Sequence, residues 1–320
     1  MNRIHQSILT NTSLKLWMIM FLVVAGGLSS CQTGQRKPSA ETAETTLPVR
    51  VMTFNIRYGT ADDGENRWEN RKNLVFEVIW SHRSDFTGLQ EALHFQIEEI
   101  LEALPAYRKI GVGRDDGKTK GEYSAILYNA DRFMVDDHGT FWFSETPEVP
   151  GSKDWGNNIT RICTWGRFVE KSSGKAMYLF NLHLDHQSQN SREKSVALLI
   201  RRIQARTYPD PVVVTGDFNA GEENPAIRYM KGMENPGGSF QTDAMNPFPL
   251  VDTFRVLHPR ATGVGTFNGF EGQTGGDKID YIFVEPTTKV LEAQILRDND
   301  QGQYPSDHFP VMARVELPVC

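Results

Sequence analysis

Polar residues able to bind a cation or a phosphate recur along this chain directly after short apolar runs. Six such positions hold the candidates Asn55; Glu91; His183, with Asp185 and His186; Asp217 and Asn219; Asp280; and Asp307 with His308. Any one of them could cap a strand or face solvent in a turn. Six together predict that carboxylates, amides and imidazoles meet at one rim of a sheet, where they would form a site for a hard cation and a phosphate.

The elements that must position these residues alternate between short apolar strands and amphipathic helices. Strands are expected over residues 49–55, 86–90, 161–169, 176–183, 212–215, 279–284 and 311–315, and a hairpin over 124–128 and 133–135. Helical spacing of apolar residues predicts helices over 70–82, around 95–101 and over 191–205. The strands of 161–169 and 176–183 are expected to pair with each other.

The strand pattern also indicates the fold class. Several strands are almost entirely apolar, which is typical of sheets covered on both faces. Some strands occur in adjacent pairs while others alternate with helices, so the sheets should be mixed. We therefore expect one α/β domain over 49–320 in which two sheets pack together with helices outside. A single doubly wound sheet is the alternative that the pattern leaves open.

The N-terminal segment has the composition of an export signal. Arg3 and Lys15 precede an apolar run over 16–28, which is too short to span a membrane. Leu28-Ser29-Ser30-Cys31 resembles the lipobox of bacterial lipoproteins, in which the cysteine is acylated. This predicts a lipoprotein signal peptide over 1–30, and a lipidated Cys31 with a flexible polar tether over 31–48. The domain would then be exported and anchored to the cell envelope, with the outer membrane as the expected site. An ordinary secretory signal with a chance cysteine is the alternative.

Charge and cysteine content narrow the function classes. The formal net charge is −6 and no run of Lys and Arg suits a polyanion, which argues against tight binding of nucleic acid. A nuclease is not excluded, because a bound Mg²⁺ would change the field at the scissile phosphate. Cys163 and Cys320 could pair, although a buried free thiol at Cys163 is the preferred interpretation. The sequence has no Cys/His cluster, so zinc is unsupported.

The strand-end motifs, taken in order, resemble the endonuclease/exonuclease/phosphatase superfamily. They are Phe54–Arg57, Leu89–Ala92, Asn181–Asp185, Thr215–Asn219, Ile279–Tyr281 and Ser306–Pro310. The resemblance covers about residues 49–317 and implies a four-layer α/β/β/α sandwich with two mixed sheets. The stretches 63–68, 111–117 and 141–147 are similar to a bacterial branch of this superfamily whose members are often lipoproteins.

The resemblance also implies a role for each candidate residue. Glu91 would be the main ligand of Mg²⁺, or of Mn²⁺ in its place, with Asn55 and Asp307 completing the metal set. Asp217 would position or deprotonate the attacking water, and Asn219 would hold that water and a phosphate oxygen. His183 would donate a hydrogen bond to a non-bridging oxygen. His308 would do the same, kept in its useful protonation state by Asp280.

Several basic residues have two interpretations each. Arg161 looks like a phosphate-contacting arginine, and an ordinary surface arginine explains its position as well. Arg57, Arg114, Lys118 and Lys120 could bind a second anionic group of the substrate, although a solvated position is expected for each. Asp185 and His186 are expected to support the loop beside His183.

These observations predict a metal-dependent phosphoester hydrolase, acting as a monomer. An acidic, tethered domain favours a phosphatase or phosphodiesterase for a small sugar-phosphate, a phosphoglycan or a lipid head group. An anchored or secreted nuclease acting on DNA or RNA is the alternative. A non-catalytic binding module would lack a metal ligand or the Asp–His partner, and this chain lacks neither.

Overall fold

The computed structural model describes residues 46–233 and 245–319. The predicted signal peptide, Cys31, the tether up to residue 45 and Cys320 lie outside the described residues. Ala43–Cys320 form one compact unit of the chain. None of the helices within the described residues is both long and apolar enough to cross a bilayer.

Two six-stranded sheets form the centre of this unit. The first sheet has the order β11 (Lys289–Ile295), β12 (Val311–Pro318), β1 (Thr46–Asn55), β2 (Phe86–Gln90), β4 (Ile126–Asn129) and β3 (Tyr107–Ile110). The second sheet has the order β5 (Phe133–Trp142), β6 (Ile162–Glu170), β7 (Ala176–His183), β8 (Val212–Asp217), β10 (Asp280–Val284) and β9 (Val251–Asp252). One neighbouring pair in each sheet is parallel, β1 with β2 and β7 with β8, and the other pairs are antiparallel. Both sheets are therefore mixed, as expected.

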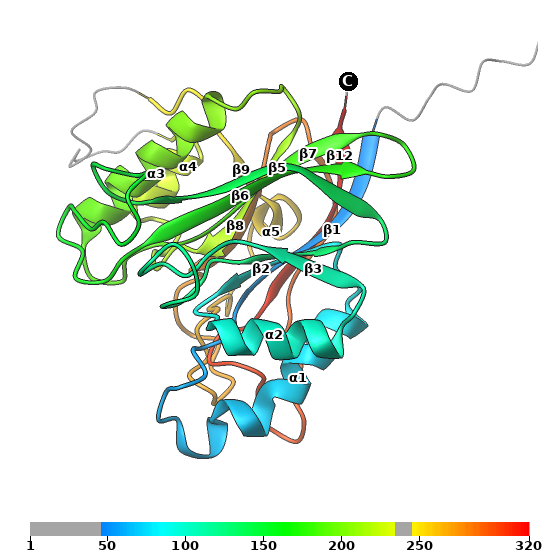
Figure 1. Ribbon diagram of the computed structural model, residues 1–320, viewed down its shortest axis with the longest axis vertical. Coiled ribbons are helices and arrows are strands. Elements are labelled where there is room, and N and C mark those ends of the chain that lie inside the picture. The colour runs from blue at the N-terminus through cyan, green and yellow to red at the C-terminus, as the bar shows by residue number, and fades with distance from the viewer. Residues whose placement is uncertain (1–45, 234–244, 320) are drawn as a thin grey trace, which may run out of the picture. The chain divides into compact units, whose positions relative to one another are not determined.

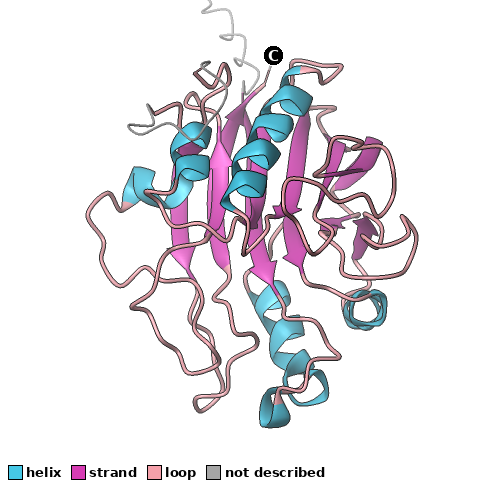
Figure 2. Cartoon of the chain, turned by 90° about the vertical axis from the view of Figure 1, so that its left-hand side faces the viewer, coloured by secondary structure: helices cyan, strands magenta, loops and turns pink. Residues whose placement is uncertain are grey.

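The helices lie outside the two sheets. The helices α1 (Trp68–Ser81) and α2 (His94–Ala103) lie on one side of the molecule, and α3 (Gln189–Gln204) and α4 (Pro225–Met230) lie on the other (Figure 1). Figure 2 shows the long helix α3 in front of the strands. Two shorter elements, a 3-10 turn η1 (Gly64–Asn66) and α5 (Thr253–Leu257), follow the strands β1 and β9.

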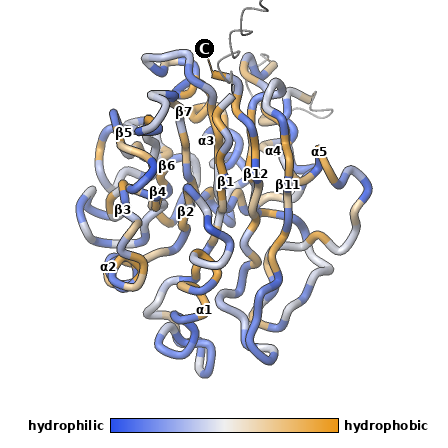
Figure 3. The backbone as a smooth tube through the Cα atoms, turned by 90° about the vertical axis from the view of Figure 1, so that its right-hand side faces the viewer, coloured by the Kyte–Doolittle hydropathy of each residue, from blue (hydrophilic) through white to orange (hydrophobic). Residues whose placement is uncertain are grey.

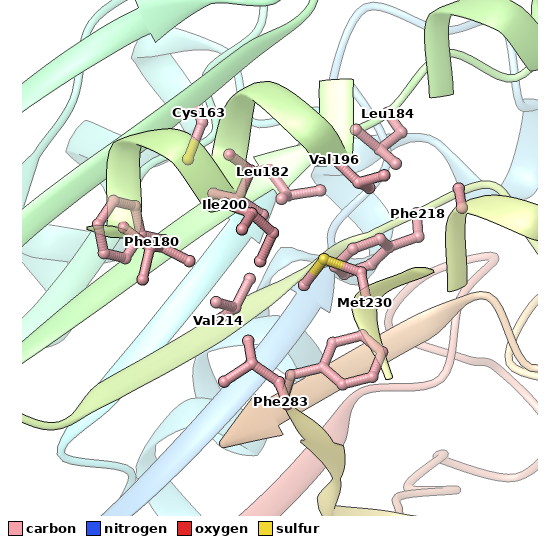
Figure 4. Packing of buried hydrophobic residues seen from close by; sticks show 14 of the residues in the cluster. Cys163, Phe180, Leu182, Leu184, Val196, Ile200, Val214, Phe218, Met230 and Phe283 are labelled. Carbon is pink, nitrogen blue, oxygen red and sulfur yellow. The ribbon is translucent and has the colours of Figure 1, made fainter. Parts of the chain in front are cut away.

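Three apolar layers separate these four layers of structure. One lies between α1, α2 and the first sheet, one between the two sheets, and one between the second sheet and α3 with α4. Along β1, Val49 and Val51 belong to the middle layer while Met52 and Phe54 belong to the layer under α1, as the two-residue period of a strand requires. Figure 3 shows the apolar strands in orange, and Figure 4 shows how Val196 and Ile200 of α3 pack near Val214 and Phe218. The fold is the predicted four-layer α/β/β/α sandwich.

A small polar network joins the two sheets close to the rim where the parallel strands end. Asn181 on β7 donates to the carbonyls of Leu89 and Ala125 in the first sheet, both at 2.9 Å. Its oxygen accepts from Gln90 at 2.7 Å and from Thr215 at 3.0 Å. A β-carbon at Gly88 would lie 2.4 Å from this oxygen, so only glycine allows the approach. These buried bonds set the position of one sheet against the other, next to the predicted site.

Two sequence expectations need correction. The segments 124–128 and 133–135 do not form a hairpin, because β4 pairs with β2 and β3 while β5 pairs with β6 in the other sheet. The chain therefore passes from the first sheet to the second between β4 and β5. Arg132 fixes this connection, because it bonds to Asp85 beside the first sheet and to Glu170 on the second. The first strand begins at Thr46, three residues inside the expected tether, because Thr46–Pro48 pair with Glu316–Pro318 of β12.

Candidate active site

The six strand-end motifs meet at one rim of the sandwich. The parallel strands β1 and β2 end there with Asn55 and Gln90, and in the second sheet His183 lies opposite Asp217 at the ends of β7 and β8. Asp280 begins the antiparallel strand β10 opposite Asp217. The start of β12 lies beside the end of β1, as Figure 3 shows, and this brings the loop with Asp307 and His308 to the same rim.

A pocket of about 580 Å³ opens at this rim. Its lining includes Arg57, Glu91, Arg114, Glu122, Arg161, His183, His186, Asp217, Asn219, Phe267, Asp277, Asp307 and His308. Asn55 and Asp280 are fully buried behind this lining. All nine predicted catalytic and metal residues, including Arg161, thus lie in or directly behind one pocket.

Asp217 is the centre of the hydrogen-bond network in the pocket. Its carboxylate accepts from the side chain of Asn55 at 3.0 Å and from the backbone N–H of Asn219 at 2.8 Å. Nε2 of His183 lies 3.4 Å from it, and Nε2 of His308 lies 3.8 Å from it. Burial, and then the charge of Asp280, raises the pKa of Asp217 to about 7. A carboxylate with this pKa is suited to accept a proton near neutral pH.

The two histidines of the pocket have opposite electrostatic environments. Nδ1 of His308 lies 2.9 Å from Asp280. Burial alone would lower the pKa of His308, but Asp280 and, less strongly, Asp217 and Asp307 raise it well above its ordinary value of 6.5. Burial lowers the pKa of His183 well below that value, and the charges of Arg161 and Arg114 lower it further. His308 is therefore the charged imidazole of the site and His183 the neutral one.

His183 and Asn219 contact each other directly. Nδ2 of Asn219 lies 2.9 Å from Nε2 of His183 and donates to the carbonyl of Leu184 at 3.0 Å. This arrangement holds the Asn219 side chain between the ends of β7 and β8. The amide is thereby fixed beside Asp217, as a residue that holds the attacking water should be.

Asn55 connects Asp217 to Glu91, the residue predicted to be the main metal ligand. Asn55 donates to Glu91 at 3.2 Å as well as to Asp217, and its own oxygen accepts from the backbone N–H of Arg57 at 3.1 Å. Asn55 thus presents its nitrogen to the two carboxylates and orients them, which leaves the oxygens of Glu91 and Asp307 as the available ligand atoms.

The charges in the pocket fit a bound cation. Five carboxylates line it against three guanidinium groups. Burial raises the pKa of Asp307, and the charge of Glu91 raises it further, against the opposing effects of His308 and Arg57. A divalent cation would compensate this negative charge, and a ligand set made only of oxygen suits a hard cation.

A second group of possible ligand atoms is less suitable. Asp217, Asp280 and His308 each place one such atom within 4.8 Å of the others. His308 is already bound by Asp280 through Nδ1, and the same carboxylates raise the pKa of its ring. A protonated imidazole repels a cation, so this group is better suited to handling protons than to binding metal.

One part of the pocket lining, which we call the basic wall, consists of Arg161 and Arg114. Arg161 is 3% exposed, and its guanidinium lies 2.9 Å from His186 and 3.5 Å from Asp185. Asp185 also accepts from two backbone N–H groups of its own loop, which is the supporting role expected for it. Arg114 pairs with Glu122 through two bonds of 2.6 and 2.7 Å. Arg161 is therefore not an ordinary surface arginine.

The remaining basic residues and one aromatic residue agree only in part with the sequence predictions. Lys118 and Lys120 are exposed and outside the pocket lining, in agreement with the solvated position expected for them. Arg57 and Arg114, for which the same was expected, line the pocket instead. Phe267, which sequence reasoning missed, is 52% exposed at the pocket and packs edge-on against His308. Its only sequence signal is its place between Thr266 and Asn268 in a glycine-rich loop.

Comparison with known proteins gives a consistent result. A model described as the Endonuclease/Exonuclease/phosphatase family matches residues 52–308. A solved structure from Bacteroides vulgatus described by the same three activities is 38% identical with a TM-score of 0.76, covering 85% of this chain and 99% of that one. A mannosyl-6-phosphatase from Bacteroides thetaiotaomicron is 33% identical with a TM-score of 0.72, covering 83% and 99%. Nocturnin from Drosophila melanogaster is 24% identical over 84% of this chain, which spans only 47% of that protein's length.

Proposed function

We propose that this chain, which belongs to the Endonuclease/Exonuclease/phosphatase family, is a Mg²⁺-dependent hydrolase of a small phosphorylated substrate. The substrate class is a sugar-phosphate, a phosphoglycan or a lipid head group. The observation that carries this proposal is the position of Asp217. Its carboxylate lies 3.8 Å from His308 of the Asp–His pair, and through Asn55 it is connected to Glu91, one of the carboxylates suited to a cation.

The residues around Asp217 then have defined tasks. Mg²⁺ bound by Glu91 and Asp307 would act as a Lewis acid toward a phosphate oxygen. Asp217 accepts the proton of the attacking water, and Asn219 holds that water in place. His308, protonated and fixed by Asp280, donates a hydrogen bond to a phosphate oxygen on which charge develops. The neutral His183 accepts a hydrogen bond from Nδ2 of Asn219 through Nε2 and so orients this amide.

The basic wall supports a compact anionic substrate. Arg161 is buried and keeps its guanidinium toward the pocket, where it can contact phosphate. The similarity to a mannosyl-6-phosphatase, at 33% identity over most of both chains, favours a phosphorylated sugar. A nuclease would need Lys and Arg along an extended groove. The net charge of −6 and the exposed, outlying positions of Lys118 and Lys120 favour the small substrate over DNA or RNA.

Substitution of the site tests the reaction. We expect Glu91→Ala and His308→Ala to lose Mg²⁺-dependent hydrolysis of phosphoesters by at least about a hundredfold while they keep their circular dichroism spectra. Glu102→Ala, at an exposed acidic residue of α2, is the matched control and should keep full activity. The substrate panel includes sugar phosphates, phospholipid head groups, DNA and RNA, with EDTA as the metal-free arm. Wild type that hydrolyses none of them with Mg²⁺ or Mn²⁺ would refute the proposal.

The location of the protein is a separate proposal. We propose that it is exported and anchored to the cell envelope, in the outer membrane, through an acylated Cys31. Support comes only from the apolar run over 16–28 and the lipobox-like stretch before Cys31. Fractionation of cells that produce wild type or Cys31→Ser tests it. Recovery of wild type in the soluble cytoplasmic fraction would contradict the anchor.

A further inference from the structure

The backbone around the pocket is strained at three residues. Arg57, Glu91 and Asn219 have φ values of 55°, 59° and 48°, a left-handed conformation that residues with a side chain rarely adopt. Such strain persists only where surrounding contacts maintain it, and it is common at functional sites. Glu91 and Asn219 belong to the metal set and the water-binding set. Arg57 shares their conformation and the pocket, yet the proposed reaction gives it no task.

The side chain of Arg57 lies at the edge of the metal ligands. Its guanidinium binds Asp63 through two hydrogen bonds, of 3.1 Å from Nε and 3.0 Å from Nη2. Nη1 lies 3.9 Å from Oε2 of Glu91, and Nε lies 3.8 Å from Oδ2 of Asp307. These two separations exceed hydrogen-bond length. Arg57 is thus fixed by Asp63 and approaches the two carboxylates without a hydrogen bond to either of them.

Hydrogen bonds also fix the backbone of Arg57. Its N–H donates to Asn55, and its carbonyl accepts from Arg71 at 3.1 Å and from Gln96 at 3.1 Å. Arg71 is fully buried. A guanidinium that is fixed at both its backbone and its side chain is preorganised, so it loses little conformational entropy when a ligand binds.

We propose that Arg57 is a phosphate-binding residue that selects a terminal phosphomonoester over a phosphodiester, an inference that rests on the proposed function. A monoester carries a charge of about −1.5 to −2 at pH 7. A diester carries a single negative charge and has one terminal oxygen fewer. Asp63 occupies only Nε and Nη2, and Nη1 lies on the side of Glu91, where a phosphate oxygen on the proposed cation would be within its reach. A fixed positive charge at this point favours the second negative charge of the monoester.

Kinetics of Arg57→Ala with matched substrates test this selection. We compare p-nitrophenyl phosphate with bis-p-nitrophenyl phosphate, and inhibition by inorganic phosphate with inhibition by dimethyl phosphate. A lost charge-assisted hydrogen bond should lower kcat/KM for the monoester, and weaken inhibition by phosphate, about ten- to a hundredfold. The diester and dimethyl phosphate should change less than about threefold. Arg57→Lys, which keeps the charge, should fall between. Arg67→Ala, an exposed arginine ten residues along the same connection, is the control.

Binding of Mn²⁺, measured by calorimetry, separates substrate binding from support of the metal site. Arg57→Ala should bind Mn²⁺ as tightly as wild type or more tightly, because a positive charge near Glu91 and Asp307 has been removed. Equal losses on monoester and diester, no loss on the monoester, or weaker Mn²⁺ binding would each overturn the inference. A wild type inactive on both of these substrates and on the whole panel above would instead overturn the proposed function, while phosphate binding to wild type and Arg57→Ala would still report on Arg57.

Discussion

Arg71 offers the sharpest test of how the site is held together. Its guanidinium donates to the carbonyls of Ile56 at 2.7 Å, Pro305 at 2.8 Å, Asn66 at 2.8 Å and Arg57 at 3.1 Å. Ile56 follows Asn55, and Pro305 precedes Asp307 by two residues. One buried side chain thus connects the loop after β1, which directly follows Asn55, with the loop before β12, which carries Asp307.

The structure sets the size of the effect expected for Arg71→Met. The bonds to Ile56 and Pro305 are fully buried, and an unpaired buried acceptor costs about 1–3 kcal/mol. Burial lowers the pKa of Arg71 from 12.5 to about 10, which shows that burying its charge costs free energy. Removing the charge avoids this cost and offsets part of the penalty for the unpaired acceptors. We expect a net loss of about 2–4 kcal/mol in the free energy of unfolding. For a domain of this size that is a decrease in Tm of roughly 5–15 °C.

Urea unfolding followed by fluorescence measures this loss, and calorimetry measures the dissociation constant of Mn²⁺. We expect Arg71→Met to bind Mn²⁺ more weakly, because the end of β1 at Asn55 and the loop with Asp307 lose their common anchor. Arg71→Lys should lose less stability, since an ammonium group can still donate to some of the carbonyls. The exposed Arg67→Met is the control. If Arg71→Met lost less than about 0.5 kcal/mol, or bound Mn²⁺ normally, the anchoring role would be refuted.

Two further predictions concern the Asp–His pair and the acid stability of the fold. Asp280→Asn removes the charge that fixes His308 and should lower kcat/KM at pH 7 by roughly a hundredfold with the fold retained, whereas a decrease under threefold would contradict the role of the pair. Burial alone would raise the pKa of Glu170, but hydrogen bonds from Ser173 and Arg132 lower it below its ordinary value of 4.5. A lowered pKa stabilises the fold above pH 4.5, and this contribution is lost as the pH falls through the folded-state value. Glu170→Gln should therefore be less stable than wild type by about 1–3 kcal/mol at pH 7, and this difference should shrink as the pH falls below 4.5, as urea unfolding over a series of pH values would show.

Much of the fold could be predicted because its strands are short, apolar and bounded by polar residues. β2 and β7 are buried at every position, so their limits stand out in the sequence. β11 was missed because it is an edge strand with few buried residues. The false hairpin before β5 had the correct local spacing. Only the pairing of β5 with β6 within the second sheet shows that the chain leaves the first sheet there.

The residues of the candidate site could be predicted to a similar extent. Residues with recognisable chemistry at strand ends, such as Glu91 and His308, were found. The position of Arg57 was not, because a left-handed backbone and a bond to Asp63 bring its guanidinium into the pocket. Nothing in the type or spacing of an arginine distinguishes this position from a solvated one.

The sequence by itself determined which side chains end each strand, and therefore which kind of chemistry the rim could support. Alternation along a strand and the polar residues at its end are local properties, so they appear in the sequence directly. The tertiary structure decided which of these side chains meet. Asn55 and Asp217 are 162 positions apart and belong to different sheets, yet they lie 3.0 Å from each other. Their contact depends on the packing of one sheet against the other and on the polar network around Asn181. The raised pKa of Asp217 also depends on tertiary structure. Burial needs the two sheets to pack, and the approach of Asp280 needs β10 to pair with β8.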